Sequence, residues 1–248
     1  MGHGAALFPA YAAALLGWCL AARATGLWRD APPPAFGRPW AELGYALLAA
    51  LAVIGVGQLW QRGLLLHETG SPLVSALNQA LIFAPMFALL ALRRQGPDTA
   101  WIPAQRAWAR LLVGAALAAL AVTVYALVRA GADAPLTVLA RLPRREHLDE
   151  AVQVFCEDVT IAVLLARLVA AVRRPWIAVV AVAALFAAGH VPALLAQDAP
   201  PAELLWLLRD VALGVGVLAA VVRARDVLWF FPIHLALDLM QFPRISGA

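Results

Sequence analysis

Three short stretches in the second half of the chain hold side chains that could carry out acid–base chemistry in apolar surroundings. Adjacent carboxylates stand at Glu157 and Asp158, an imidazole at His190, and a second imidazole at His234, four residues before Asp238. Side chains four residues apart share one face of a helix. A charge at the centre of a membrane costs about 2.5–3.5 kcal/mol on insertion scales, so each such group calls for a partner or a function. These residues therefore predict a buried polar cluster that can move protons.

Their positions along the predicted helices place these groups at similar depths. Glu157 lies near the start of a predicted span over 151–171, and His190 lies near the end of the next, antiparallel span over 175–196. His234 and Asp238 come within about a turn or two of that level if their segment runs parallel to 175–196. Three separate helices are thus expected to supply one site.

Eight apolar segments are expected to be the helices that position these groups. They cover residues 5–22, 43–60, 72–92, 107–129, 151–171, 175–196, 203–222 and 227–243. Each is close to the length of about 20 residues with which a helix crosses a hydrocarbon core of about 30 Å. Breaks such as Gln95-Gly96-Pro97-Asp98 and Arg173-Arg174-Pro175 separate the segments.

The composition agrees with a membrane protein. Hydrophobic residues make up 63% and charged residues 14% of the 248 positions, against roughly 45–50% and about 25% in soluble domains. Mean hydropathy is +0.80. The expected fold class is all-α, a polytopic membrane bundle of about eight transmembrane helices forming one integral membrane domain over 1–248. The first apolar run lacks a positively charged leader and reads as a retained span instead of a cleaved signal peptide.

The net charge of +4 comes entirely from arginine, because the sequence contains no lysine. Arginine beside hydrophobic spans is a topology signal, and nucleic-acid binding is not expected. More arginines lie in the first, third, fifth and seventh connections than on the other side. The positive-inside rule then places both termini outside and opens the cluster toward the extracytoplasmic half of the lipid bilayer.

The three motifs together resemble those of a known family. An acidic pair, then Phe-x-x-x-His, then His-x-x-x-Asp, each on its own late span, is similar to the pattern of intramembrane glutamic endopeptidases of the CAAX protease and bacteriocin-processing family. The resemblance covers about residues 150–243, whereas the first four spans match only in being hydrophobic. The family's first motif is usually Glu-Glu-x-x-x-Arg, but here Asp158 replaces the second Glu and Ala162 stands at the Arg position.

The resemblance implies a metal-free peptidase with no cofactor. In it Glu157 is the general base and holds the attacking water together with His190. His234, partnered by Asp238, stabilises the oxyanion, and Asp158 restrains His190 or a substrate amide. The implied substrate is a membrane-associated protein or peptide, such as one with a C-terminal sorting segment, in a bacterial inner membrane.

Two other interpretations, one of the acidic pair and one of the neighbouring Cys156, stay open on the sequence. Glu157 and Asp158 could form a structural pair with Arg167 or Arg209 of neighbouring helices. Cys156, next to Glu157, could be a thiol nucleophile with His190 as its base, although small apolar cysteines are common in membrane spans. Neither of the two cysteines lies in a predicted loop, so no disulfide between loops is indicated.

Two other functions also stay open. In a zinc-dependent intramembrane metallopeptidase, His190, His234 and Glu157 or Asp238 would be the ligands, but the sequence has no His-Glu-x-x-His motif. In a catalytically inactive transport or immunity-type protein, the cluster would carry protons or bind a partner. The alanine at position 162 is the feature that most favours this second alternative.

Overall fold

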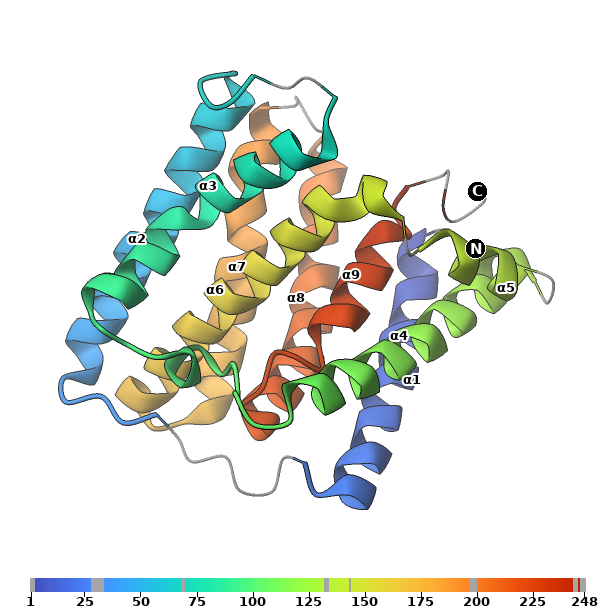
Figure 1. The fold of residues 1–248 in the computed structure, drawn as a ribbon, viewed down its shortest axis with the longest axis horizontal. Helices are drawn as coiled ribbons and strands as arrows, with labels where there is room; N and C mark the ends of the chain where they lie inside the picture. The colour runs from blue at the N-terminus through green and yellow to red at the C-terminus, as the bar shows by residue number, and fades with distance from the viewer. Residues whose placement is uncertain are drawn as a thin grey trace.

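The computed structural model describes residues 3–27, 34–67, 70–131, 134–142, 144–196, 200–242 and 245. The regular elements of these residues are all helical, which confirms the predicted all-α class (Figure 1). The α-helices are α1 (His3–Thr25), α2 (Pro39–Gln61), α3 (Pro72–Leu92), α4 (Ala107–Ala130), α5 (Ala134–Arg141), α6 (Leu148–Val172), α7 (Pro175–Ala196), α8 (Pro201–Ala224) and α9 (Phe231–Leu239). Two short 3₁₀ helices cover Pro97–Ala100 and Arg145–His147.

Five of the described helices, α1, α2, α3, α4 and α7, are long and apolar enough to cross a membrane. The mean hydropathy of their most apolar windows lies between 1.7 and 2.5. Helices α6 and α8 are equally long but carry charged residues within their length, including Glu157 and Asp158 on α6 and Arg209 and Asp210 on α8. The chain is therefore a multi-pass membrane protein with its polar residues concentrated on the later helices.

The eighth predicted segment is not a full span. Helix α9 has nine residues, which at 1.5 Å per residue gives a length of only about 13 Å. The first residues of the predicted segment, from Val227 to Phe230, form a turn instead, and Pro232 lies in the first turn of α9. The eight-residue helix α5, between α4 and α6, was not predicted.

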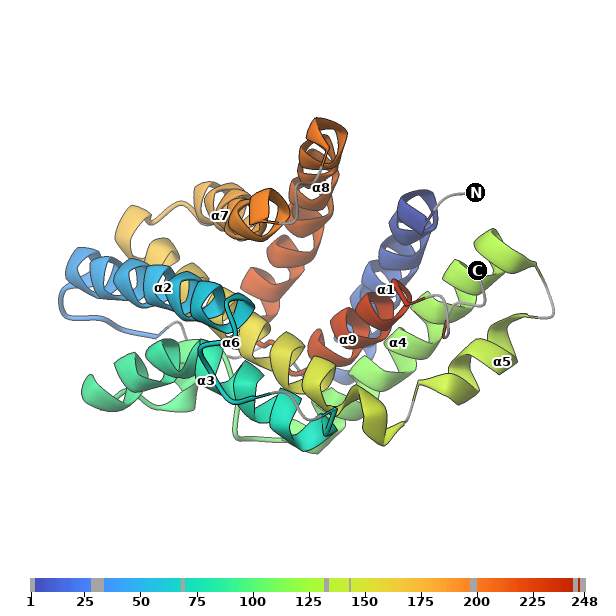
Figure 2. The same cartoon turned by 90° about the horizontal axis from the view of Figure 1, so that it is seen from above.

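Helix α6 lies at the centre of the bundle, packed against α2, α3, α7 and α9 (Figures 1 and 2). All side chains from residue 161 to 167 are buried. The surrounding helices instead turn large apolar side chains outward, such as Leu16 and Leu20 of α1, Leu48 of α2 and Leu112 of α4. Outward leucines around a charged central helix suit lipid as the surrounding solvent.

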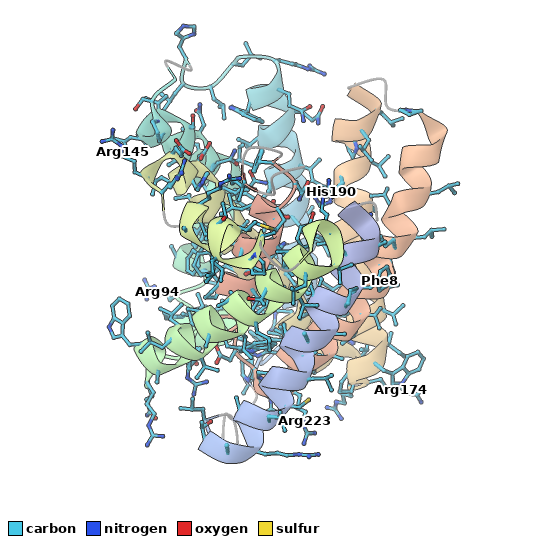
Figure 3. The ribbon with its side chains drawn as sticks, turned by 90° about the vertical axis from the view of Figure 1, so that its right-hand side faces the viewer. Phe8, Arg94, Arg145, Arg174, His190 and Arg223 are labelled. Carbon is cyan, nitrogen blue, oxygen red and sulfur yellow. The ribbon has the colours of Figure 1, made fainter. Side chains whose placement is uncertain are left out.

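The connections alternate between two ends of the bundle. In Figure 1 the connections after α1, α3, α6 and α8 lie at one end, and those after α2, α4 and α7 lie at the other. Figure 3 places Arg174 and Arg223 toward the first end, and Arg145 and His190 toward the second. Helix α5 stays at the second end. It therefore does not change which connections share an end, and the comparison of arginines between the two ends is unaffected.

Two contacts hold the beginning of α9 against α4. A buried ion pair joins Arg110 of α4 to Asp226 in the turn before α9, at 2.6 Å, and Asp226 also accepts the main-chain N–H of Leu228 at 2.8 Å. Gly114 of α4 touches the same turn so closely that a Cβ there would collide with the carbonyl oxygen of Trp229. These contacts fix the height and orientation of the helix that carries His234.

Candidate functional site

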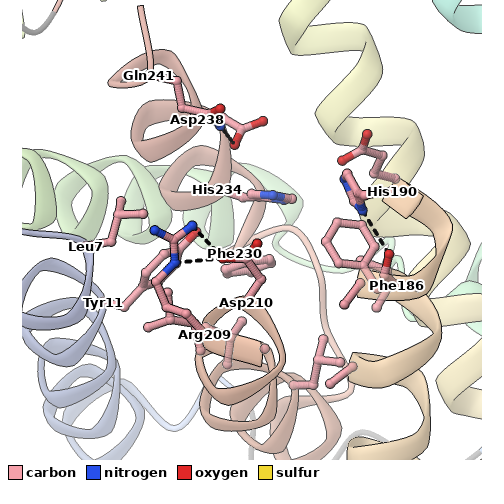
Figure 4. Close-up of a pocket in the computed structure, with 18 of the residues that line it drawn as sticks. Leu7, Tyr11, Phe186, His190, Arg209, Asp210, Phe230, His234, Asp238 and Gln241 are labelled. Atoms are coloured by element: carbon pink, nitrogen blue, oxygen red, sulfur yellow. Dashed lines mark hydrogen bonds and ion pairs between the residues drawn. The ribbon is translucent and has the colours of Figure 1, made fainter. Parts of the chain in front are cut away.

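A polar cavity of about 440 Å³ lies between α1, α6, α7, α8 and α9. Four of the five predicted site residues line it: Glu157 from α6, His190 from α7, and His234 and Asp238 from α9. Figure 4 shows His190 and His234 on facing sides of the cavity, with their rings turned toward each other. The structure thus brings together side chains that are far apart in the sequence.

The Glu157 carboxylate is oriented by a residue of its own helix. Gln153, one turn earlier on α6, donates from Nε2 to Glu157 Oε1 at 2.9 Å. Arg167, one of the structural partners considered for the acidic pair, lies further along α6 and donates to Gln95 Oε1 at 2.5 Å. Arg209, the other, pairs with the adjacent Asp210 at 2.8 Å. Among the described residues, Glu157 is therefore bonded as a carboxylate at a cavity wall, and not as the partner of either arginine.

His190 is held by the main chain of α7. Its Nδ1 lies 2.9 Å from the carbonyl oxygen of Phe186 and donates to it. The Phe186 ring packs edge-on against the imidazole, with 4.8 Å between the ring centroids. This bond fixes the tautomer and leaves Nε2 as the nitrogen with a lone pair. The spacing of four residues between Phe186 and His190 therefore decides which nitrogen of the His190 ring can accept a hydrogen bond.

His234 is paired with Asp158, and the predicted pairing with Asp238 is wrong. Its Nδ1 lies 2.9 Å from Asp158 Oδ1, and Asp158 is only 1% exposed. Successive residues on a helix point about 100° apart, so Glu157 faces the cavity while Asp158 faces α9. Phe230 stacks on the His234 ring at 5.2 Å. With Nδ1 engaged, Nε2 is the nitrogen left for the cavity.

Asp158 and Asp238 therefore differ from the roles that the family resemblance implies for them. Asp158 supports His234 instead of His190, and it is not among the described residues that line the cavity. Asp238 lines the cavity one turn beyond His234 and accepts a hydrogen bond from Gln241 Nε2 at 2.7 Å.

The cavity also contains polar residues that the sequence analysis did not include. Gln153 shares a helix face with Glu157, so its spacing alone could have indicated it. Tyr11 and Arg209 lie on the side of the cavity away from His190 (Figure 4). No spacing in the sequence connects Tyr11 on the first helix with motifs 146 or more residues later, because only tertiary packing brings them together.

A second, apolar cavity of about 520 Å³ lies between α2, α3, α6 and α7. Glu157 and His190 line this cavity as well, together with Gln153 and Phe186. The carboxylate and one imidazole therefore stand where a polar space and an apolar space meet.

The described residues also bear on metal and thiol chemistry at this site. Among the described residues, no three His, Cys, Asp or Glu side chains come together in a group that could hold a metal ion. Cys156 is buried, and the described linings of the two cavities do not include it.

The fold and the site define a class: multi-pass helical membrane proteins with carboxylate and imidazole groups around an internal cavity. No family model matches the chain, and neither a curated protein nor a solved structure matches it. A carboxylate and two imidazoles around one cavity, one imidazole bonded through Nδ1 to a carbonyl oxygen and the other to a carboxylate, can take a proton from water at one point and donate a hydrogen bond at another.

Proposed function

We propose that the protein is an intramembrane peptidase of the glutamic type, which cleaves a membrane-associated protein or peptide with a water molecule that Glu157 activates. One observation carries the proposal: Glu157, His190 and His234, from three helices, line a single cavity. The similarity of the three motifs to those of the CAAX protease and bacteriocin-processing family supports the same reaction.

The proposed reaction begins with a water molecule between Glu157 and His190. Glu157 accepts a proton from the water as His190 Nε2 holds it, and the oxygen attacks the scissile carbonyl carbon. A C–O bond forms and the carbonyl oxygen becomes an oxyanion. Glu157 then passes its proton to the nitrogen of the scissile amide, the C–N bond breaks, and the products are a carboxylic acid and an amine.

His234 is assigned to the oxyanion. Because Asp158 takes the Nδ1 hydrogen, an imidazolium at this position directs its second N–H, on Nε2, into the cavity. A fixed donor aimed at developing negative charge is worth about 10²–10³-fold in rate. Asp238, at the rim with Gln241, is placed to accept a hydrogen bond from the substrate main chain.

The proposed setting is a bacterial inner membrane with the arginine-rich end in the cytoplasm. Since His190 lies toward the opposite end, the site then opens to the extracytoplasmic half. A substrate with a C-terminal sorting or processing segment suits that location.

The test is a cleavage assay with the full chain in liposomes. Membrane peptides with an apolar stretch and a polar end are incubated with the protein, and mass spectrometry identifies products. His190→Gln and His234→Gln should each lower kcat by about 10²–10⁴-fold, because each removes a group that holds the water or the oxyanion. His147→Gln is the matched control, since His147 is buried at the start of α6 outside the cavity lining. Unchanged rates in both site variants would reject the proposal.

Metal removal separates this reaction from the zinc alternative. Because the described residues provide no group of three metal ligands, a strong chelator is expected to leave the cleavage rate unchanged. Loss of activity with the chelator, restored by zinc, would favour a metallopeptidase.

A further inference from the structure

The apolar cavity is open to the outer surface of the bundle. We call it the α2–α7 groove; its walls include Ile54 and Gly57 of α2 and Leu185 and Gly189 of α7, and its floor includes Thr160 and Leu164 of α6. Leu185 is exposed, as is Leu51, which lines the groove from α2. In a membrane, such a groove faces lipid at one side and Glu157 and His190 at the other.

One polar group in the α2–α7 groove is without a partner. The Thr160 hydroxyl is buried and makes no hydrogen bond with any described residue. Threonine in a helix often donates to the carbonyl four residues earlier, as Thr123 does to Ala119 at 2.7 Å. A lipid chain offers the Thr160 hydroxyl nothing, whereas a peptide group offers both a donor and an acceptor.

We propose that the α2–α7 groove binds the apolar segment of a peptide substrate beside the scissile bond, and that the partly exposed Thr160 side chain rotates to bring its buried hydroxyl onto the peptide main chain. The inference rests on the proposed peptidase function. The segment on one side of the scissile bond lies in the groove, and the other, polar end lies in the polar cavity. The substrate class is then a membrane-embedded peptide in which an apolar stretch borders a polar end.

Two glycines allow the groove to be filled from opposite walls. A Cβ at Gly189 would meet nothing within 4 Å, and one at Gly57 would meet only Ile82 Cγ2, at 3.8 Å. Gly57→Leu and Gly189→Leu should therefore fold and block the groove. Gly55→Leu is the control on α2, because a Cβ there also meets nothing and Gly55 does not line the groove. Ala188→Leu, at an exposed position outside both cavity linings, is the control on α7.

Binding is measured without hydrolysis. A synthetic peptide with a Leu/Ala stretch, a polar end and a benzophenone group in the stretch is photo-crosslinked to the Glu157→Gln protein in liposomes. Gly57→Leu and Gly189→Leu, added to that background, should each lower the crosslinked yield at least about tenfold, and the two controls should not. Equal yields in all four variants would overturn the proposal.

A second variant separates a peptide occupant from a lipid. Thr160→Val keeps the side-chain shape and removes the hydroxyl, so peptide crosslinking should fall about three- to tenfold, as expected for one lost hydrogen bond. Thr123→Val is the control. A phospholipid with a benzophenone in its acyl chain serves as the competing probe; if it labels the groove and the peptide does not, the proposal is wrong. Groove-dependent peptide binding without cleavage by the unmodified protein would keep the groove assignment and reject the peptidase.

Discussion

Two buried pairs of ionisable side chains in this bundle differ in purpose. The Arg110–Asp226 pair joins helix α4 to the turn before α9, where an uncompensated charge would cost several kcal/mol. The Asp158–His234 pair instead fixes one nitrogen of a ring whose other nitrogen faces a cavity. The first pair serves packing, and we assign the second to catalysis.

The pairing of His234 with Asp158 predicts different effects on catalysis for substitutions of Asp158 and of Asp238. Asp158→Asn should lower kcat by about 10²–10⁴-fold with KM little changed, because a neutral amide no longer stabilises the imidazolium of His234, whose Nε2–H is the proposed oxyanion donor. Asp238→Asn should have a much smaller effect on kcat. Steady-state cleavage kinetics measure both. An Asp238→Asn loss larger than that of Asp158→Asn would restore the pairing inferred from the i, i+4 spacing.

The sequence was enough to identify the ionisable residues of the site, but not all of their hydrogen-bond partners. Glu157, His190 and His234 were found because ionisable residues in apolar helices are costly. Spacing within one helix correctly related His190 to Phe186, but it wrongly related His234 to Asp238. The rotation of α6 against α9 decides which carboxylate meets His234, and that rotation depends on packing between residues 76 positions apart.

Helix α9 is the element on which the site depends most. It is short, it follows a turn, and it reaches its position through contacts with α4 at Gly114 and Arg110. Small residues allow helices in membranes to approach closely. The position of His234 therefore depends on a glycine of a different helix, which lies against Trp229 and Pro232.

Gly114→Ala should displace α9. The added Cβ would collide with the Trp229 carbonyl and lie 3.1 Å from Pro232 Cδ, and such overpacking typically costs about 1–3 kcal/mol. We expect a lower thermal unfolding temperature in detergent and a lower kcat. Gly44→Ala is the control, because a Cβ there meets nothing within 4 Å. Wild-type stability and rate in Gly114→Ala would show that this contact does not position the site.

The elements themselves were largely predictable from hydropathy. Seven predicted segments correspond to helices α1–α4 and α6–α8, because long apolar runs between polar breaks leave few alternatives. The helical length of the eighth segment was overestimated, because hydropathy alone does not show that the first residues of an apolar run form a turn. Helix α5 was missed because eight residues are too few for a span and their pattern resembles that of a connection.

The described bundle turns large apolar side chains outward, and α6 borders a polar cavity within its mostly apolar core. Its connections alternate between an end with Arg174 and Arg223 and an end with Arg145 (Figure 3). Positive residues are retained on the cytoplasmic side. The proposed orientation follows from this asymmetry and puts the site in the extracytoplasmic half.

Cysteine labelling in intact cells tests that orientation. In a protein with Cys19 and Cys156 replaced by alanine, Arg145→Cys should react with a membrane-impermeant maleimide added outside, since Arg145 is exposed at the proposed outer end. Arg174→Cys, exposed at the other end (Figure 3), should react only after the membrane is permeabilised. The opposite pattern would place the site toward the cytoplasm.

The most direct test of the account compares two adjacent residues of α6 in one cleavage assay. Glu157 lines both cavities, whereas Cys156 is buried outside their described linings. Glu157→Gln should reduce cleavage of a membrane peptide to background while the protein stays folded, and Cys156→Ala should cleave at nearly the wild-type rate. Cleavage that persists in Glu157→Gln, or that disappears in a folded Cys156→Ala, would contradict a water molecule activated by Glu157.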